Sequence, residues 1–206
     1  MTERDSLPPW RRDGARVLAA AGRGLAALGL RVGELTSWLV VGIIAAVLTT
    51  VALNALGVNE IARWGSDVPL FGQAVTINSV TELQWHLFGV LTLLGGTYAL
   101  HHDDHVRVDL LYQRLSPRGR AIVDIAGHAL LLIPFCLLIA WLYRNSVAMA
   151  WMSGERSNYG GLTDRYLIKA MLPAGLVFLA LGALGQICER AAGLLEPARL
   201  TGEERQ

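Results

Sequence analysis

Four stretches of the chain, residues 35–59, 83–100, 125–143 and 170–188, contain no Asp, Glu, Lys or Arg. A helix needs about 20 largely apolar residues to cross the ~30 Å of hydrocarbon in a bilayer. Because no water reaches backbone groups at that depth, a crossing segment must satisfy its own hydrogen bonds as a helix. We therefore predict an all-α membrane protein with four transmembrane helices, at about residues 35–56, 80–100, 122–143 and 170–189.

Composition agrees with this prediction. The 206 residues are 53% hydrophobic and only 17% charged, with a mean hydropathy of +0.40, which is too apolar for an ordinary soluble domain. The net charge is +1 and the arginines are dispersed between apolar segments, so no nucleic-acid partner is expected. Cys136 and Cys188 both lie in apolar runs, and we interpret them as packing residues.

The distribution of basic residues predicts the orientation. Thirteen of the 18 lie in the first 34 residues, between the second and third spans, or after the fourth span. Five lie in the other two connections, namely Arg63, Arg144, Arg156, Arg165 and Lys169. By the positive-inside rule both termini and the connection 101–121 are cytoplasmic. The expected location is therefore a membrane that the chain crosses four times, with these parts on its cytoplasmic side.

Residues 10–30 have the pattern of an amphipathic helix. Three arginines share one face at helical spacing, while the opposite face is apolar: Arg12, Arg16 and Arg23 against Val17, Ala21, Leu25 and Leu28. Such a helix is expected to lie on the anionic inner surface of the bilayer. The chain then divides into a cytoplasmic tail, 1–34, a four-helix membrane domain, 35–190, and a second cytoplasmic tail, 191–206.

Further residues are predicted to hold the spans at their depth. Trp38 falls at the inner end of the first span and Trp85 at the outer end of the second, where tryptophans are enriched. Arg107, Arg118 and Arg120 lie in the basic connection on the inner side. We expect these side chains to contact the membrane interface.

Five histidines suggest a competing class, a four-helix membrane redox protein that binds haem or a metal. His101 and His105 are four residues apart, but a first-row metal would need further ligands. His86 and His128 differ in predicted depth by on the order of 12 Å, which one iron does not bridge. We therefore expect no cofactor and no metal, and we interpret His86 and His128 as hydrogen-bonding residues between helices.

We interpret the acidic residues Glu82 and Asp124 as structural caps of helices, with contact to a substrate or an ion as the alternative. The sequence Ser79 to Glu82, "SVTE", matches a capping box, in which Glu82 reaches back to the start of the helix. Asp124 lies near the start of the third span, where the helix dipole stabilises an acidic group. Small residues form stripes that either pack the chain on itself or meet a partner, namely Gly42, Ala46, Gly89, Gly96, Gly175, Gly182 and Gly185.

Three blocks carry a resemblance: "ELQWHLFGVLTLLGGTYAL", then "HDDHVRVDLLYQRLSPRGRAIVDIAG", then "GERSNYGGLTDRYLIKAMLPAGLVFLALGALGQ". Their order resembles the small membrane subunit of tripartite ATP-independent periplasmic (TRAP) transporters, over residues of about 35 to 190. The connection 57–78 departs from the family by its length, and its "NEIARWG" is consistent with a turn of surface helix.

The resemblance implies a location in a bacterial inner membrane and a function that is not enzymatic. In that family a periplasmic binding protein delivers a carboxylate-bearing solute to a large membrane subunit, which imports it with sodium. The small subunit braces the large one and helps to dock the binding protein. It implies that this chain binds neither solute nor sodium, and that its partners are the large subunit, the binding protein and the bilayer. The expected docking residues are Glu155, Arg156, Asp164 and Arg165.

Overall fold

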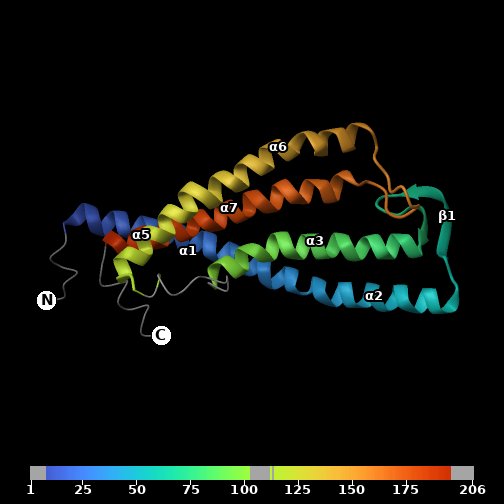
Figure 1. The fold of residues 1–206 in the computed structure, drawn as a ribbon, viewed down its shortest axis with the longest axis horizontal. Coiled ribbons are helices and arrows are strands. Elements are labelled where there is room, and N and C mark those ends of the chain that lie inside the picture. Colours follow the sequence, from blue (N-terminus) through green and yellow to red (C-terminus); the bar gives the residue numbers. More distant parts are fainter. Residues whose placement is uncertain (1–7, 103–111, 113, 196–206) are drawn as a thin grey trace. The chain divides into compact units, whose positions relative to one another are not determined.

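The computed structural model of the protein describes residues 8–102, 112 and 114–195 (Figure 1). It consists mainly of long helices, with one β-hairpin after the second of them. The elements are α1 (Pro9–Ser37), α2 (Leu39–Leu56), β1 (Glu60–Val68), β2 (Gly72–Thr76), α3 (Ile77–His101), α5 (Pro117–Gly127), a π-helical turn (His128–Leu132), α6 (Ile133–Met152) and α7 (Tyr166–Leu195). Arg107 and His105 lie outside the described residues.

The helices confirm that the chain is mainly helical, and their length and composition agree with a membrane protein. Three described segments are long and apolar enough to cross a bilayer: Trp10–Leu56, Pro117–Met152 and Tyr166–Leu195. Helix α3 contains the predicted second span and, with 25 residues, is long enough to cross a bilayer, but it is less apolar than these three segments. The first predicted span begins within α1, and the break between α1 and α2 falls at Trp38.

The connection after α2 differs from the prediction. Gly57 ends α2 in the left-handed conformation, with φ +68°, and its N–H donates to the carbonyl of Asn54. The chain then forms an antiparallel hairpin, β1 with β2, in which Glu60 pairs with Thr76 and Val68 with Gly72. The predicted turn of surface helix at 59–65 is therefore wrong. The physical reason is the cross-strand pairing with 72–76, which a local reading of "NEIARWG" does not contain.

Contacts between residues divide the chain into two compact units. The first comprises Met1–Arg31, Thr97–Leu137 and Phe178–Gln206, and the second comprises Val32–Gly96 and Leu138–Val177. The long helices pass from one unit into the other, so each unit contains segments of several helices.

In the first unit, glycines bring α1, α3 and α7 into close contact. A Cβ added to Gly22 would clash with Glu189 and lie 3.0 Å from the carbonyl oxygen of Gly185. A Cβ on Gly182 would lie 2.5 Å from Thr97, and one on Gly185 would lie 2.9 Å from Leu25. These glycines therefore pack the chain on itself, which answers the open question for the stripe in the fourth span.

The second unit is packed in a similar way. A Cβ on Gly175 of α7 would lie 2.6 Å from Leu93 of α3. The amide of Gln84 on α3 donates to the carbonyl oxygen of Ala46, at 3.0 Å, and to the hydroxyl of Thr50, at 2.7 Å, both on α2. A polar side chain in a span is costly unless it finds such a partner, so these bonds compensate for the polarity of α3.

Asp124 does not lie in the first turn of its helix. It is the eighth residue of α5 and is buried in the first unit. Its carboxylate accepts a hydrogen bond from the hydroxyl of Tyr112, at 2.8 Å, and lies 3.5 Å from Nε of Arg190 on α7. The predicted role at a helix terminus is thus replaced by an ion pair between helices.

Candidate docking platform

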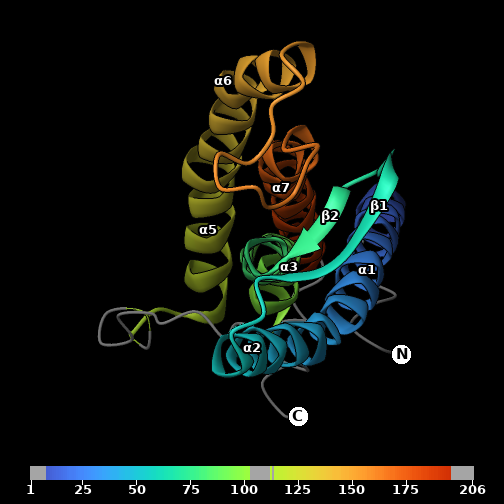
Figure 2. The same ribbon diagram turned by 90° about the vertical axis from the view of Figure 1, so that its right-hand side faces the viewer.

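The hairpin and the loop between α6 and α7 form one surface of the second unit. We define the platform as residues 60–76 together with residues 153–165. Figure 2 shows the loop lying beside β2, above the start of α3. The N–H of Thr163 donates to the carbonyl of Leu70, at 2.8 Å, and the hydroxyl of Thr76 donates to the carbonyl of Gly160, at 3.0 Å. The two connections therefore fold together, although the residues joined by these bonds are 93 and 84 positions apart in the sequence.

The tip of the hairpin depends on one aspartate of the loop. Leu70 has φ +71°, a conformation that is costly for a residue with a bulky side chain. Its N–H donates to Oδ2 of Asp164, at 3.0 Å. Asp164 has φ +56° and also lies within reach of the Thr163 hydroxyl. Asp164, a predicted docking residue, thus contacts Leu70 and Thr163, which both belong to the platform.

Glu82 of α3 holds the loop by two hydrogen bonds. Its carboxylate accepts hydrogen bonds from the hydroxyl of Ser157 and from the N–H of Leu162, the latter at 2.9 Å. Gly161 fits over this carboxylate because a Cβ there would lie 2.5 Å from it. Leu162 is fully buried. Glu82 therefore positions the loop.

The predicted capping box at Ser79 to Glu82 is wrong by one helical turn. Helix α3 begins at Ile77, so Thr76 occupies the N-cap position. The hydroxyl of Thr76 accepts from the N–H of Ser79, and the hydroxyl of Ser79 accepts from the N–H of Thr76, both at 3.2 Å. This reciprocal pair satisfies the helix start, and it leaves Glu82 available for the loop.

Glu155 pairs with two basic residues at the other side of the loop. Its carboxylate lies 2.5 Å from Nζ of Lys169 and 3.8 Å from Nε of Arg165. The hydrogen bond from Lys169, followed by the charges of Lys169 and Arg165, holds the pKa of Glu155 below its ordinary value. These three side chains are half-buried, so Glu155 and Arg165 fix where the loop enters α7.

Arg156 differs from the other three predicted docking residues. Its side chain is 63% exposed, and its nearest acidic neighbour is Asp67 on β1, with Nη2 3.6 Å from Oδ2. That separation makes an ion pair but exceeds the ~2.7–3.2 Å of an N–H···O hydrogen bond. Arg156 is therefore the predicted docking residue that is most open to a partner.

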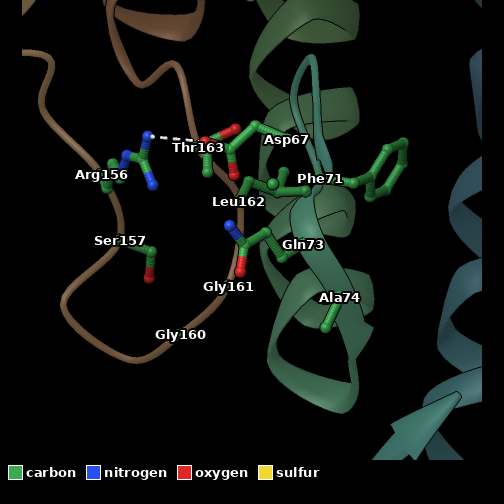
Figure 3. Close-up of a pocket in the computed structure, with 11 residues that line it drawn as sticks. Asp67, Phe71, Gln73, Ala74, Arg156, Ser157, Gly160, Gly161, Leu162 and Thr163 are labelled. Carbon is green, nitrogen blue, oxygen red and sulfur yellow. Dashed lines mark ion pairs between the residues drawn. The ribbon is translucent and has the colours of Figure 1, made fainter. Parts of the chain in front are cut away.

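A cavity of about 280 Å³ lies between the hairpin and the loop, beside the Arg156–Asp67 pair. Figure 3 shows the guanidinium of Arg156 directed toward Asp67, and the amide of Gln73 directed toward the loop near Gly161. A second cavity, of about 230 Å³, is lined by Val68, Pro69 and Asp164. Both cavities share Asp67, Gly72, Arg156 and Thr163.

The platform includes residues that sequence reasoning did not select. Asp67 and Gln73 belong to the hairpin, and the signal that could have found them was the unusual length of the connection 57–78. Arg63 is also exposed on the hairpin, but Glu60 accepts two hydrogen bonds from it, at 2.9 and 2.7 Å. The predicted docking loop and the unpredicted hairpin thus share one surface.

The residues predicted at the membrane interface are distributed along the helices. Trp38 and Trp85 are largely exposed, at 74% and 70%. Arg16 and Arg23 are exposed on α1, whereas Arg12 is partly covered. Arg118 and Arg120 lie in the first turn of α5, and the guanidinium of Arg120 lies 5.6 Å from the ring centre of Tyr112. Their contact with lipid remains a prediction.

The histidines show no metal site in the described part of the chain. No group of three or more His, Cys, Asp or Glu side chains there could hold a metal ion. His86 contacts the carbonyl oxygen of Glu82 through Nδ1, at 2.6 Å, one turn earlier in its own helix. His128 is buried at the start of the π-helical turn. The interpretation of His86 as a hydrogen-bonding residue between helices is therefore wrong, because its bond lies within α3.

Comparison with known protein families gives a match over much of the chain. Residues 69–193 match the family model described as the DctQ component of tripartite ATP-independent periplasmic transporters. The matched region includes the hairpin tip, β2, α3, α5, α6, the platform loop and most of α7. No curated protein and no solved structure matches the chain.

Proposed function

Because the chain belongs to the DctQ component family of tripartite ATP-independent periplasmic transporters, we propose that it is the small membrane subunit that braces the large transport subunit. In this proposal it acts without catalysis as a scaffold of a sodium-coupled importer of organic acids. The chain also contributes its platform to docking of the periplasmic substrate-binding protein. The family match over more than half of the chain is the observation that carries the proposal.

The membrane arrangement is part of the proposal. Helix α3 joins the three long apolar segments as a fourth span, so that residues 35–190 form the membrane domain and both cytoplasmic tails lie in the inner compartment. The basic residues of the sequence support this orientation. The bonds from Gln84 to α2 support α3 as a span, because they satisfy a polar side chain of α3 within the protein.

A scaffold role agrees with how the chain uses its surfaces. The closest glycine contacts are made within each unit, as at Gly22, Gly175 and Gly182. Large apolar side chains are exposed along α2 and α6 instead, among them Val41, Ile44, Leu48, Val51, Leu138, Trp141 and Leu142. Exposed apolar area of this kind belongs against lipid or against another membrane protein.

The proposal is tested by co-expressing the tagged chain with the large subunit and purifying through the tag in mild detergent. We expect the large subunit to be recovered in a stable ratio with the chain. An unrelated four-helix membrane protein with the same tag provides the control for non-specific capture. Recovery of the chain without the large subunit, from membranes that contain both, would contradict a scaffold role.

A further inference from the structure

The platform offers an arginine whose hydrogen-bonding groups are not yet used. Among the residues that the structure describes, the guanidinium of Arg156 makes an ion pair with Asp67 but donates no hydrogen bond within normal distance. A guanidinium has five N–H donors in a planar fork that matches a carboxylate. Arg63, on the same platform, already gives two such bonds to Glu60.

The cavity beside Arg156 gives an incoming side chain room to reach this fork. It has a volume of about 280 Å³ and is open between the hairpin and the loop (Figure 3). Around it lie the amide of Gln73 and the hydroxyls of Ser157 and Thr163. Ser157 already donates to Glu82, and Thr163 lies within hydrogen-bonding reach of Asp164. Arg156 and Gln73 are therefore the side chains best placed to donate to a new acceptor.

Rigidity of the surrounding backbone favours recognition at this point. The loop that carries Arg156 is held by Glu82 on one side and by Thr76 and Leu70 on the other. A surface that is already ordered loses little conformational entropy when a partner binds. The Arg156–Asp67 ion pair is exposed to solvent, unlike the bonds that hold the loop, since the side chain of Asp67 is 53% exposed. A partner can therefore reach Arg156.

We propose that Arg156 receives a carboxylate side chain of the periplasmic binding protein at the mouth of this cavity, and that Asp67 competes with that carboxylate for the same guanidinium. This inference rests on the proposed docking function. Asp67 keeps Arg156 directed toward the cavity in the free subunit and weakens binding of the partner.

Two single substitutions are expected to change the affinity for the binding protein in opposite directions. Arg156→Gln removes both the receiving charge and the donor fork and is expected to weaken binding by about tenfold. Asp67→Asn removes the competing charge and is expected to strengthen binding by about threefold. Arg156→Lys keeps the charge but loses the fork, so its affinity is expected to fall between those of the wild type and Arg156→Gln.

The experiment is a titration of the purified binding protein onto the complex of this chain with the large subunit in lipid nanodiscs. Arg63→Gln is the matched control, because it removes an exposed arginine from the same platform whose fork is already filled by Glu60. We expect it to leave the affinity within about twofold of the wild type.

Each other outcome overturns the inference. Tighter binding by Arg156→Gln with weaker binding by Asp67→Asn would assign a cationic group to the partner. Weaker binding by both variants would make the ion pair purely structural, and unchanged binding by both would place the contact elsewhere. If the wild-type complex does not bind the binding protein at all, the docking function itself fails, which is distinguishable from each of these patterns.

Discussion

Replacing Gly22 with alanine is expected to destabilise the chain, whereas the same replacement at Gly24, two residues later in α1, is expected to stabilise it slightly. A Cβ at Gly22 would lie 3.0 Å from the backbone oxygen of Gly185 and 3.2 Å from the backbone nitrogen of Glu189. Backbone atoms of α7 cannot move aside without shifting the helix. Overpacking of this kind costs about 1–3 kcal/mol of unfolding free energy.

Gly24 provides a matched control because nothing lies within 4 Å of an added Cβ there. Alanine is favoured over glycine in a helix by about 0.5–1 kcal/mol. Gly24→Ala is expected to gain this stability, whereas at Gly22 the clash outweighs it. Thermal unfolding of the purified variants in detergent, followed by circular dichroism, gives the comparison. Equal melting temperatures for the two variants would show that α1 does not pack closely on α7.

Replacing Glu82 with alanine is expected to release the platform loop without unfolding the helices. The carboxylate accepts bonds from the Ser157 hydroxyl and the Leu162 N–H, and its removal leaves both donors without their recorded acceptor. Hydrogen bonds to a charged group contribute about 1.5–3 kcal/mol each. Exchange of the Leu162 amide with deuterium should therefore accelerate by at least about tenfold.

The control for this variant is Glu60→Ala. Glu60 is also an acidic residue of the second unit, but its recorded side-chain contact is with Arg63 on the same strand. We expect it to leave exchange in the peptide 157–163 unchanged. If Glu82→Ala exchanges at the wild-type rate in that peptide, the loop is held by the hairpin alone and the role assigned to Glu82 is wrong.

The helical parts of the fold could be predicted because the bilayer imposes a strong and local constraint. A charge-free run of about 20 residues must be helical whatever its neighbours are. The structure accordingly has helices over all four predicted segments, although α6 continues past residue 143 to Met152. Helix ends are harder to predict, since the charge at Arg144 does not stop a helix that continues outside the apolar region.

The hairpin and the role of Glu82 could not be predicted, because both depend on residues distant in sequence. Strand pairing of Glu60 with Thr76 and the bond from Leu162 to Glu82 are set by tertiary folding. A capping box at Ser79 was a reasonable local reading, but Thr76 supplies the cap one turn earlier. The ion pair of Asp124 is equally hard to predict, because its partner Arg190 is 66 residues away in sequence. The local pattern around Asp124 indicates only a helix terminus.

The docking residues show the same limit. All four predicted residues fall on the platform loop, where Glu155, Asp164 and Arg165 make contacts within the chain. Sequence alone does not distinguish a charged residue that holds a loop from one that is open to a partner. The exposure of Arg156 and its long separation from Asp67 make that distinction in the structure.

The most direct test of the account is the side of the membrane on which the platform lies. In a variant whose Cys136 and Cys188 are replaced by serine, a single cysteine is introduced by Ser66→Cys on β1 or by Asp13→Cys on α1, both at exposed positions. A membrane-impermeant maleimide is then applied to spheroplasts. We expect labelling of the Ser66→Cys protein in intact spheroplasts, and of the Asp13→Cys protein only after lysis. Labelling of Asp13→Cys in intact spheroplasts, with Ser66→Cys protected until lysis, would place the platform on the inner side and contradict the docking function.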